Sequence, residues 1–252
     1  MTSPLVDFHC HLDLYPDFAD LVRECEKRRV LTLAVTTTPQ AWTRNRELAS
    51  ATKYVRAALG FHPQLVGERW REIDLWLRIL PETRYVGEVG LDAGPAHFRT
   101  LDRQKEVFRT VLQACAAAGD KVLSVHSLRA VKPTLDMLEE HLPLGRGKVV
   151  LHWFTGTQAE ARRAVGLGCH FSVNAPMLRN ERGCKLVFGL PPERLLTETD
   201  GPFTEEAGRP CRPWDVATTL GLLQHQIPSG LVAADLVASN LKALLAPGVI
   251  GR

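Results

Sequence analysis

The sequence predicts an α/β protein built as a (β/α)8 TIM barrel, and three observations support this prediction. The chain has 252 residues, which is close to the size of one such barrel. Its composition, 45% hydrophobic and 23% charged, is that of an ordinary globular protein with an ample core. Short apolar runs alternate with longer amphipathic stretches eight times, which favours a closed parallel barrel over an open sheet. We expect one domain that spans residues 1–252.

Eight apolar runs are expected to form the strands of the barrel. Each run is short, rich in valine and leucine and bounded by turn residues, which is typical of buried parallel strands. In chain order the predicted strands span 5–9, 31–35, 55–59, 85–88, 122–126, 149–152, 169–172 and 194–198.

Amphipathic stretches between these runs are expected to form the outer layer of helices. Residues 101–118 carry apolar side chains at helical spacing up to Gly119, which is placed to end the helix. The other predicted helices span 17–29, 130–142, 158–167 (followed by Gly168), 214–225 and 231–245. The proline- and glycine-rich segments 191–192 and 201–213 are expected to be loops.

Charge and cysteine usage restrict the class of protein. The formal net charge is +3, which suits a phosphate-rich substrate but is far below that of a dedicated nucleic-acid-binding protein. Six cysteines are scattered without a CxxC pair, which indicates buried thiols in a reducing compartment rather than a disulfide framework. We see no signal peptide and no run of about 20 apolar residues. We therefore expect a cytoplasmic protein that does not enter a membrane.

The strongest local signal for a site is the pair His9 and His11 at the end of the first predicted strand. Side chains alternate along a strand, so these two imidazoles point to the same face and can bind one metal ion. Asp7 is expected to support them from behind. Such a pair is weak evidence by itself, because two surface histidines would give the same pattern.

Four further candidates fall at other strand ends. Glu88 follows the fourth predicted strand, His126 the fifth, His152 the sixth and Asp200 the eighth. Active sites of such barrels are built at the carboxyl ends of the strands, so these side chains are expected to meet His9 and His11. The complete set predicts a metal site where no single residue would.

The residue types favour a catalytic metal centre. Four imidazoles and two carboxylates, without a thiolate, suit Zn, Mn or Mg with open coordination positions. A central carboxylate can bridge two ions and activate water between them, and Glu88 is the candidate for that bridge.

Two other residues are candidate substrate contacts. His62 ends the third predicted strand in Gly60-Phe61-His62-Pro63, although a structural turn before proline fits equally well. Arg129 could grip a phosphate with its guanidinium group, although a solvated residue at a helix start fits equally well.

The motifs as a set resemble the TatD family of metal-dependent deoxyribonucleases, whose fold is the TIM barrel of the metal-dependent hydrolase superfamily. The resemblance covers nearly the whole chain, in the family's order. Its motifs are DFHCHLD at 7–13, GFHP at 60–63, GEVGLD at 87–92, VHS at 125–127, LHWFTG at 151–156, LLTETDGPF at 195–203 and Asn240.

The resemblance implies a two-metal phosphodiesterase. On that basis His9, His11, Glu88 and Asp200 would hold one divalent ion, and Glu88, His126 and His152 the second. Glu88, Asp200 and Glu198 would be the catalytic residues, with Glu198 positioning water or metal. The implied reaction is hydrolysis of DNA phosphodiester bonds, commonly from a 3′ end of single strands.

The chain departs from the common family pattern where substrate contacts are expected. The usual H-x-R becomes His126-Ser127-Leu128-Arg129, Trp153 stands where cysteine is frequent, and 93–99 lacks the usual aromatic and basic residues. The loop 204–213 also lacks the usual asparagine before a proline. The predicted metal ligands are all retained. The resemblance therefore supports the family's type of reaction more strongly than its substrate.

The variants VDFHCHLDLYPD, AVTTTP and LHWFTG are similar to the TatD-like nuclease of bacterial Qat anti-phage systems. That similarity implies antiviral defence together with other proteins of a Qat-type operon. Two alternatives stay open: a small-molecule amidohydrolase or phosphatase that uses the same metal site, and a non-catalytic subunit of a defence complex.

Overall fold

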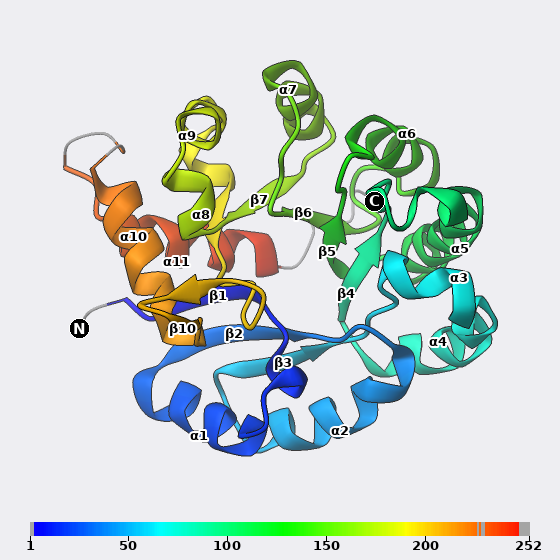
Figure 1. The fold of residues 1–252 in the computed structure, drawn as a ribbon, viewed down its shortest axis with the longest axis horizontal. Helices are drawn as coiled ribbons and strands as arrows, with labels where there is room; N and C mark the ends of the chain where they lie inside the picture. Colours follow the sequence, from blue (N-terminus) through cyan, green and yellow to red (C-terminus); the bar gives the residue numbers. More distant parts are fainter. Residues whose placement is uncertain (1–2, 226, 228–229, 247–252) are drawn as a thin grey trace.

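In the computed structural model, which describes residues 3–225, 227 and 230–246, eight parallel strands form the predicted barrel. Figure 1 shows the strands in the centre of the molecule with the helices around them. The strands are β1 (Leu5–Cys10), β2 (Val30–Val35), β3 (Val55–Ala58), β4 (Tyr85–Gly90), β5 (Val122–His126), β6 (Lys148–His152), β7 (His170–Val173) and β8 (Leu195–Thr197). Each lies within two residues of its predicted bounds.

The eight strands form two hydrogen-bonded ladders, β1-β2-β3 and β4 to β8, which are joined at two seams. At the first seam Leu59 forms a parallel bridge with Val86. At the second seam the loop after β8 completes the barrel: the Asp200 N–H donates to His9 O at 2.8 Å, and the His11 N–H donates to Gly201 O at 2.8 Å. This second seam fixes Asp200 beside the two histidines of the β1 end.

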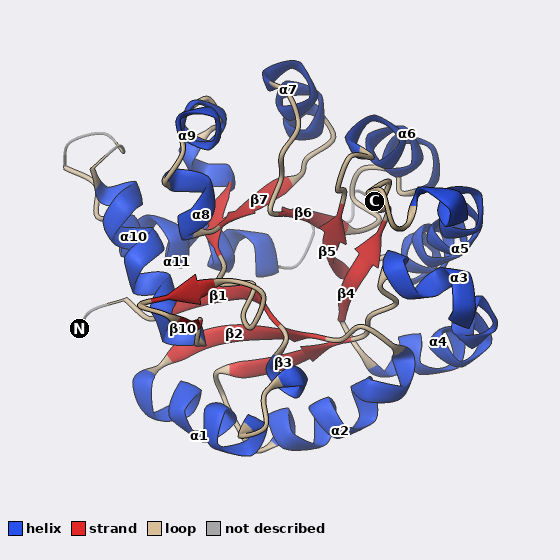
Figure 2. Cartoon of the chain, in the orientation of Figure 1, coloured by secondary structure: helices blue, strands red, loops and turns tan. Residues whose placement is uncertain are grey.

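The helices lie outside the strands, as Figure 2 shows. They are α1 (Phe18–Arg28), α2 (Pro39–Ser50), α3 (Val66–Arg69), α4 (Ile73–Ile79), α5 (Leu101–Ala118), α6 (Val131–His141), α7 (Gln158–Gly166), α8 (Ala175–Leu178), α9 (Glu181–Phe188), α10 (Val216–Gln224) and α11 (Ala233–Leu245). Gly119 ends α5 with a left-handed φ of 80°, which confirms its predicted role, and Gly168 follows α7 with φ 78°.

Two helix starts and one loop differ from the sequence predictions. Helix α10 begins at Val216 and helix α11 at Ala233, so the starts predicted at residues 214 and 231 are each wrong by two residues. The predicted loop 201–213 contains the short antiparallel strands β9 (Glu205–Glu206) and β10 (Arg209–Pro210). Ala207 (φ 52°) and Gly208 (φ 75°) form the turn between them, and two-residue strands are too short to leave a periodic pattern. Within the described ranges, none of the helices has the length and apolarity to cross a membrane.

Candidate active site

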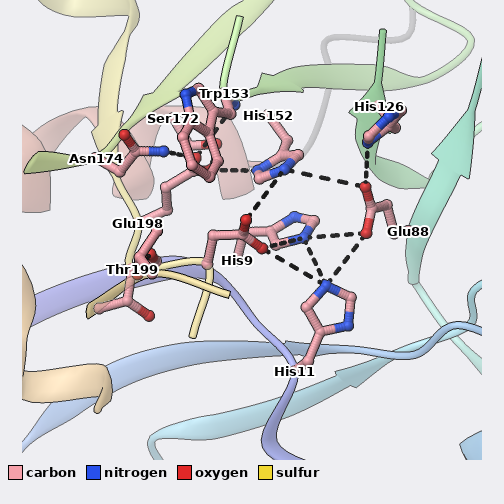
Figure 3. Close-up of polar contacts among 12 residues, drawn as sticks. His9, His11, Glu88, His126, His152, Trp153, Ser172, Asn174, Glu198 and Thr199 are labelled. Carbon is pink, nitrogen blue, oxygen red and sulfur yellow. Dashed lines mark hydrogen bonds and ion pairs between the residues drawn. The ribbon is translucent and has the colours of Figure 1, made fainter. Parts of the chain in front are cut away.

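The six predicted metal ligands meet at the carboxyl end of the barrel. Figure 3 shows His9, His11, Glu88, His126 and His152 among them. His9 Nε2 and His11 Nε2 lie 3.3 Å apart. Glu88 Oε2 lies 3.4 Å from His9 Nε2 and 3.2 Å from His11 Nε2, and Asp200 Oδ1 lies 3.6 Å from both. Four ligand atoms from the carboxyl end of β1, from β4 and from the loop after β8 therefore face one point.

The second half of the cage lies on the other side of Glu88. Glu88 Oε1 is 2.6 Å from His126 Nδ1 and 4.0 Å from His152 Nε2. Asp200 Oδ2 lies 3.9 Å from the same atom of His152. Each of the two carboxylates thus presents one oxygen to His9 and His11, while the other oxygen of Glu88 faces His126 and His152 and that of Asp200 faces His152.

His62 also belongs to this cluster, because its imidazole lies directly beside Glu88. Its Nε2 lies 3.2 Å from Glu88 Oε2, while its Nδ1 accepts a hydrogen bond from the Gln64 N–H at 3.2 Å. The backbone after β3 bonds to β4, with the Phe61 N–H donating to Glu88 O at 2.8 Å, so His62 and Glu88 are held together.

Arg129 does not line the cavity of the cage. Its side chain is exposed and lines a neighbouring depression, so its predicted contact with a substrate phosphate stays a prediction for that adjoining surface. The cause is the additional residue in His126-Ser127-Leu128-Arg129: Leu128 takes the place that faces the cavity, and Arg129 turns away with a left-handed backbone (φ 52°).

Glu198 lies behind His152 instead of facing the cavity. Its carboxylate accepts hydrogen bonds from His152 Nδ1 at 2.9 Å, the Trp153 N–H at 3.1 Å, Asn174 Nδ2 at 3.0 Å and the Ser172 hydroxyl. These four contacts use its oxygens, so Glu198 fixes the orientation of the His152 ring. Ligand atoms of Glu198, His9 and His152 also lie within 4.8 Å of one another, so its expected role in positioning water or metal stays a prediction.

Of the other residues that support the cage, Asp7 was expected from the sequence and the rest were not. Ser124 Oγ lies 2.7 Å from His9 Nδ1, and Asp92 Oδ2 lies 3.1 Å from His126 Nε2. Asp7 supports the cage through the backbone, because it accepts from the His9 N–H and from Thr199 rather than from an imidazole. Ser172 and Asn174 could have been found, because they stand at the end of the seventh strand, where the rule that identified the other ligands applies.

The electrostatics of the cage follow from burial among opposite charges. Burial opposes ionisation of Glu88, but His62, His9, His11 and His126 together hold its pKa well below the usual range. Burial disfavours a charged His126, yet hydrogen bonds to Asp92 and Glu88 raise its pKa to about 9. Burial raises the pKa of Asp200 to about 7 against the opposing effect of His152 and His11.

The residues present fit divalent cations. The His9 and His152 rings stack with centroids 3.7 Å apart, and His9 Nε2 and His11 Nε2 face each other, which is unfavourable for two charged imidazoles. His11 Nδ1 is buried and has no hydrogen-bond partner among the described residues. Neutral imidazole nitrogens and carboxylate oxygens converging without a thiolate are the donor set of a catalytic metal centre.

The cage opens into a cavity of about 300 Å³. Its floor is formed by polar cage residues, among them His11, Glu88 and Asp200, and its walls include Leu128, Trp153 and Phe203. This volume is at the lower end of the range of small-molecule sites, so the cavity accommodates one substrate moiety of modest size.

Comparisons with known proteins agree with this arrangement. The family model described as TatD related DNase matches residues 6–245. The chain is 32% identical over 233 residues to the deoxyribonuclease TATDN3 of Homo sapiens, with 84% of each chain covered. It is 31% identical over 245 residues to the uncharacterized metal-dependent hydrolase YcfH of Escherichia coli, covering 87% of this chain and 88% of that protein.

Solved structures show the same fold. The crystal structure of YjjV, a TatD homolog from Escherichia coli, superposes with a TM-score of 0.83 at 26% identity, covering 97% of this chain and 98% of that one. An uncharacterized amidohydrolase from Saccharomyces cerevisiae superposes with a TM-score of 0.77 at 16% identity, covering 96% and 99%. The second likeness concerns the fold alone.

Proposed function

The chain belongs to the TatD-related DNase family of metal-dependent hydrolases, and from this premise we propose that it hydrolyses phosphodiester bonds of DNA, preferentially single-stranded and from an end. The observation that carries the proposal is the position of Glu88, whose two oxygens face two separate sets of imidazoles. A carboxylate between two ligand sets is the arrangement expected of a two-metal phosphodiesterase.

We assign His9, His11, Glu88 and Asp200 to one divalent ion and Glu88, His126 and His152 to the second. The nitrogen and oxygen donors suit Mg, Mn or Zn. Bound there, the ions would supply positive charge for the phosphate oxygens and lower the pKa of a water molecule.

The side chains of the chain itself have separable roles in this proposal. Glu88 stays ionised and sets the spacing of the two ligand groups. Asp200 directs one carboxylate oxygen toward His152, and that oxygen can accept a proton from the attacking water. Glu198 holds the His152 ring in place, and His62, at the cavity wall, is placed to contact the substrate phosphate.

One surface beside the cage supports a polyanionic substrate. The depression lined by Arg129, Lys132 and Arg182 adjoins the cavity through the shared residues Leu128 and Thr155. Arg129 makes no hydrogen bond or ion pair within the part of the chain that the structure describes. A strand that leaves the cavity on this side would meet cationic groups that favour its phosphates.

The test is hydrolysis of labelled single- and double-stranded DNA by purified protein with Mg or Mn. We expect the His126→Ala variant to lose activity by at least about 100-fold, because a ligand of one ion is removed. The exposed His225→Ala variant serves as the matched control and should keep wild-type activity. Inert wild-type protein, or equal activity in His126→Ala, would contradict the proposal.

A small-molecule hydrolase is the second candidate, and the size of the cavity favours it. The described residues that line the cavity include no lysine or arginine, which is unusual for a dedicated phosphate-backbone site. Turnover of phosphomonoesters or cyclic amides by the same preparation, with inert DNA, would select this candidate.

The defence role is proposed on the motif variants alone. On that basis the enzyme would act in the cytoplasm with the other proteins of a Qat-type operon, and its hydrolase activity would be required for protection. The test is the plating efficiency of phage on cells that carry the operon, with wild-type protein or His126→Ala. Equal protection by both would show that the role does not require hydrolysis.

A further inference from the structure

Three apolar side chains line the cavity without being fully buried. Phe203 is 62% exposed, Leu128 is 41% exposed, and the indole of Trp153 is half-buried. All three line the cavity above the cage. Large apolar groups that are exposed to water raise the free energy of the unbound protein. A ligand that covers them removes this unfavourable contribution.

Trp153 is held in this position by the cage. It directly follows His152, its N–H donates to Glu198 Oε1 at 3.1 Å, and its backbone adopts a left-handed φ of 37°. That conformation is unfavourable for a residue with a side chain, and here the hydrogen bond to Glu198 maintains it. The indole lies roughly perpendicular to the His152 ring, with ring centroids 6.3 Å apart (Figure 3).

Phe203 is fixed from the opposite side of the barrel seam. Its N–H donates to Asp200 O at 2.9 Å, and its ring meets the His11 ring edge to face with centroids 5.1 Å apart. Each aromatic side chain therefore lies within three residues of a candidate metal ligand, one after β6 and one after β8. Their positions are coupled to the geometry of the cage.

The chemistry of the walls limits what the substrate presents there. The described lining has no lysine or arginine, so binding energy away from the ions must come from apolar and aromatic faces. Aromatic rings stack on nucleobases and gain a similar free energy with every base.

We propose that Trp153 and Phe203 form an aromatic subsite that stacks the unpaired nucleobase next to the scissile phosphate. The inference rests on the proposed nuclease function and deepens it, because it names the part of the substrate that the cavity selects. A base within a duplex is already stacked and paired, so this subsite favours single strands or frayed ends.

The test compares two labelled octamers that carry the same phosphates, oligothymidine and an octamer of abasic tetrahydrofuran residues. Their affinity for the full-length protein is measured by fluorescence anisotropy with Ca in place of Mg or Mn, and electrophoresis after each titration checks that both octamers remain intact. We expect wild-type protein to prefer oligothymidine by about 10-fold, which corresponds to stacking of one base. Trp153→Ala and Phe203→Ala should each reduce this preference to about 2-fold, while Trp153→Phe should retain most of it.

Matched controls separate stacking from general destabilisation. Trp70 is half-buried and Phe98 is 53% exposed, and neither lines the cavity, so Trp70→Ala and Phe98→Ala should keep the wild-type preference. Equal affinity of wild-type protein for both octamers, binding of neither, or a preference that persists in Trp153→Ala and Phe203→Ala would overturn the inference. DNA hydrolysis with Mn is scored separately: a base preference without hydrolysis would reject the nuclease proposal and leave the subsite standing.

Discussion

The two ends of the barrel both bury polar side chains, but they satisfy them in different ways. At the carboxyl end, His9, His11 and Glu88 face one another. At the opposite end, buried donors face backbone carbonyls: Lys121 Nζ donates to Thr83 O at 2.7 Å, and Asn240 Nδ2 donates to Pro192 O and Leu195 O, each at 2.8 Å.

This difference separates function from stability. A backbone carbonyl is a partner that the fold itself supplies, so Lys121 and Asn240 stabilise the chain without a ligand. Converging imidazoles and carboxylates instead leave lone pairs directed at one point, and a cation completes the arrangement. Asn240 belongs to the motifs that resemble the family, yet it lies far from the cage, at the start of β8 rather than at its end.

The largest effect is expected from Glu88→Gln, because the bridging charge is lost from both ligand sets. DNA hydrolysis should fall by at least about 1,000-fold. Added Mn should raise the Tm of wild-type protein and leave that of the variant almost unchanged, since ligand binding stabilises the native state. The metal-free unfolding free energy should change by less than about 2 kcal/mol, because neighbouring imidazoles can lose their protons and leave no unpaired buried charge.

Glu82→Gln is the matched control for this variant. Glu82 precedes β4, is half exposed and pairs with Arg46 at the other end of the strand, so its charge should not affect activity. Activity of Glu88→Gln within about 10-fold of wild type would remove the functional distinction between the two ends of the barrel.

Glu198→Gln tests whether a residue that lies behind the metal ligands also affects activity. The amide can still meet some donors around it, but it binds the His152 Nδ1–H less strongly than a carboxylate does. We expect a loss of about 10- to 100-fold in kcat/KM and a higher Mn concentration for half-maximal activity, both measured in one titration. The exposed Glu193→Gln variant is the control and should keep the wild-type Mn requirement. An unchanged Mn requirement in Glu198→Gln would show that Glu198 affects only stability.

Strand-end position was sufficient to predict most of the cage from the sequence. Parallel strands bring their carboxyl ends together whatever their order, so Glu88, His126, His152 and Asp200 could be placed beside His9. The orientation of a side chain beyond the strand end depends on the loop backbone, which the sequence does not specify. For that reason Glu198 turns behind His152, and Arg129 turns away after Leu128.

In the fold, too, some segments could be predicted from the sequence and others could not. Strands and long helices such as α5 have enough apolar periodicity to be predicted within a few residues. Helix α2 has a broken pattern, with half of its buried contacts made by Pro39 and Asn45, and the four-residue α3 and α8 are too short for any period. These segments take their structure from packing against the barrel rather than from local propensity.

At the opposite end, Asn240→Ala should affect stability and not activity. The variant loses two hydrogen bonds and leaves the Pro192 and Leu195 carbonyls with fewer partners. We expect the unfolding free energy to fall by about 2 kcal/mol in urea, with kcat/KM within about 2-fold of wild type at 25 °C. Gln113 is an exposed amide on α5, and Gln113→Ala should lower the unfolding free energy by less than about 0.5 kcal/mol. An equal loss in both variants would show that Asn240 has no special stabilising role.

The smallest expected effect is the pH dependence of stability that His170 causes. Among the described residues at this end of the barrel, His170 is the buried imidazole that faces cations instead of carboxylates. Burial, reinforced by Arg194 and Lys148, lowers its pKa to about 4. The unfolded chain has the higher pKa, about 6.5, so it binds the proton first as the pH falls, and stability is lost between pH 6.5 and 4. Between pH 6.5 and 5.5 this contribution is about 1 kcal/mol.

Urea unfolding of wild-type protein and His170→Gln at these two pH values isolates this contribution, because the remaining titrating groups are common to both proteins. The variant should lose about 1 kcal/mol less than wild type on acidification. His126 in the cage predicts the opposite sign: although burial opposes its charge, hydrogen bonds to Asp92 and Glu88 raise its pKa to about 9, so its protonation favours the folded state. If both proteins lost the same stability, His170 would be as accessible to protons as in the unfolded chain, and the contrast in charge between the two ends would fail.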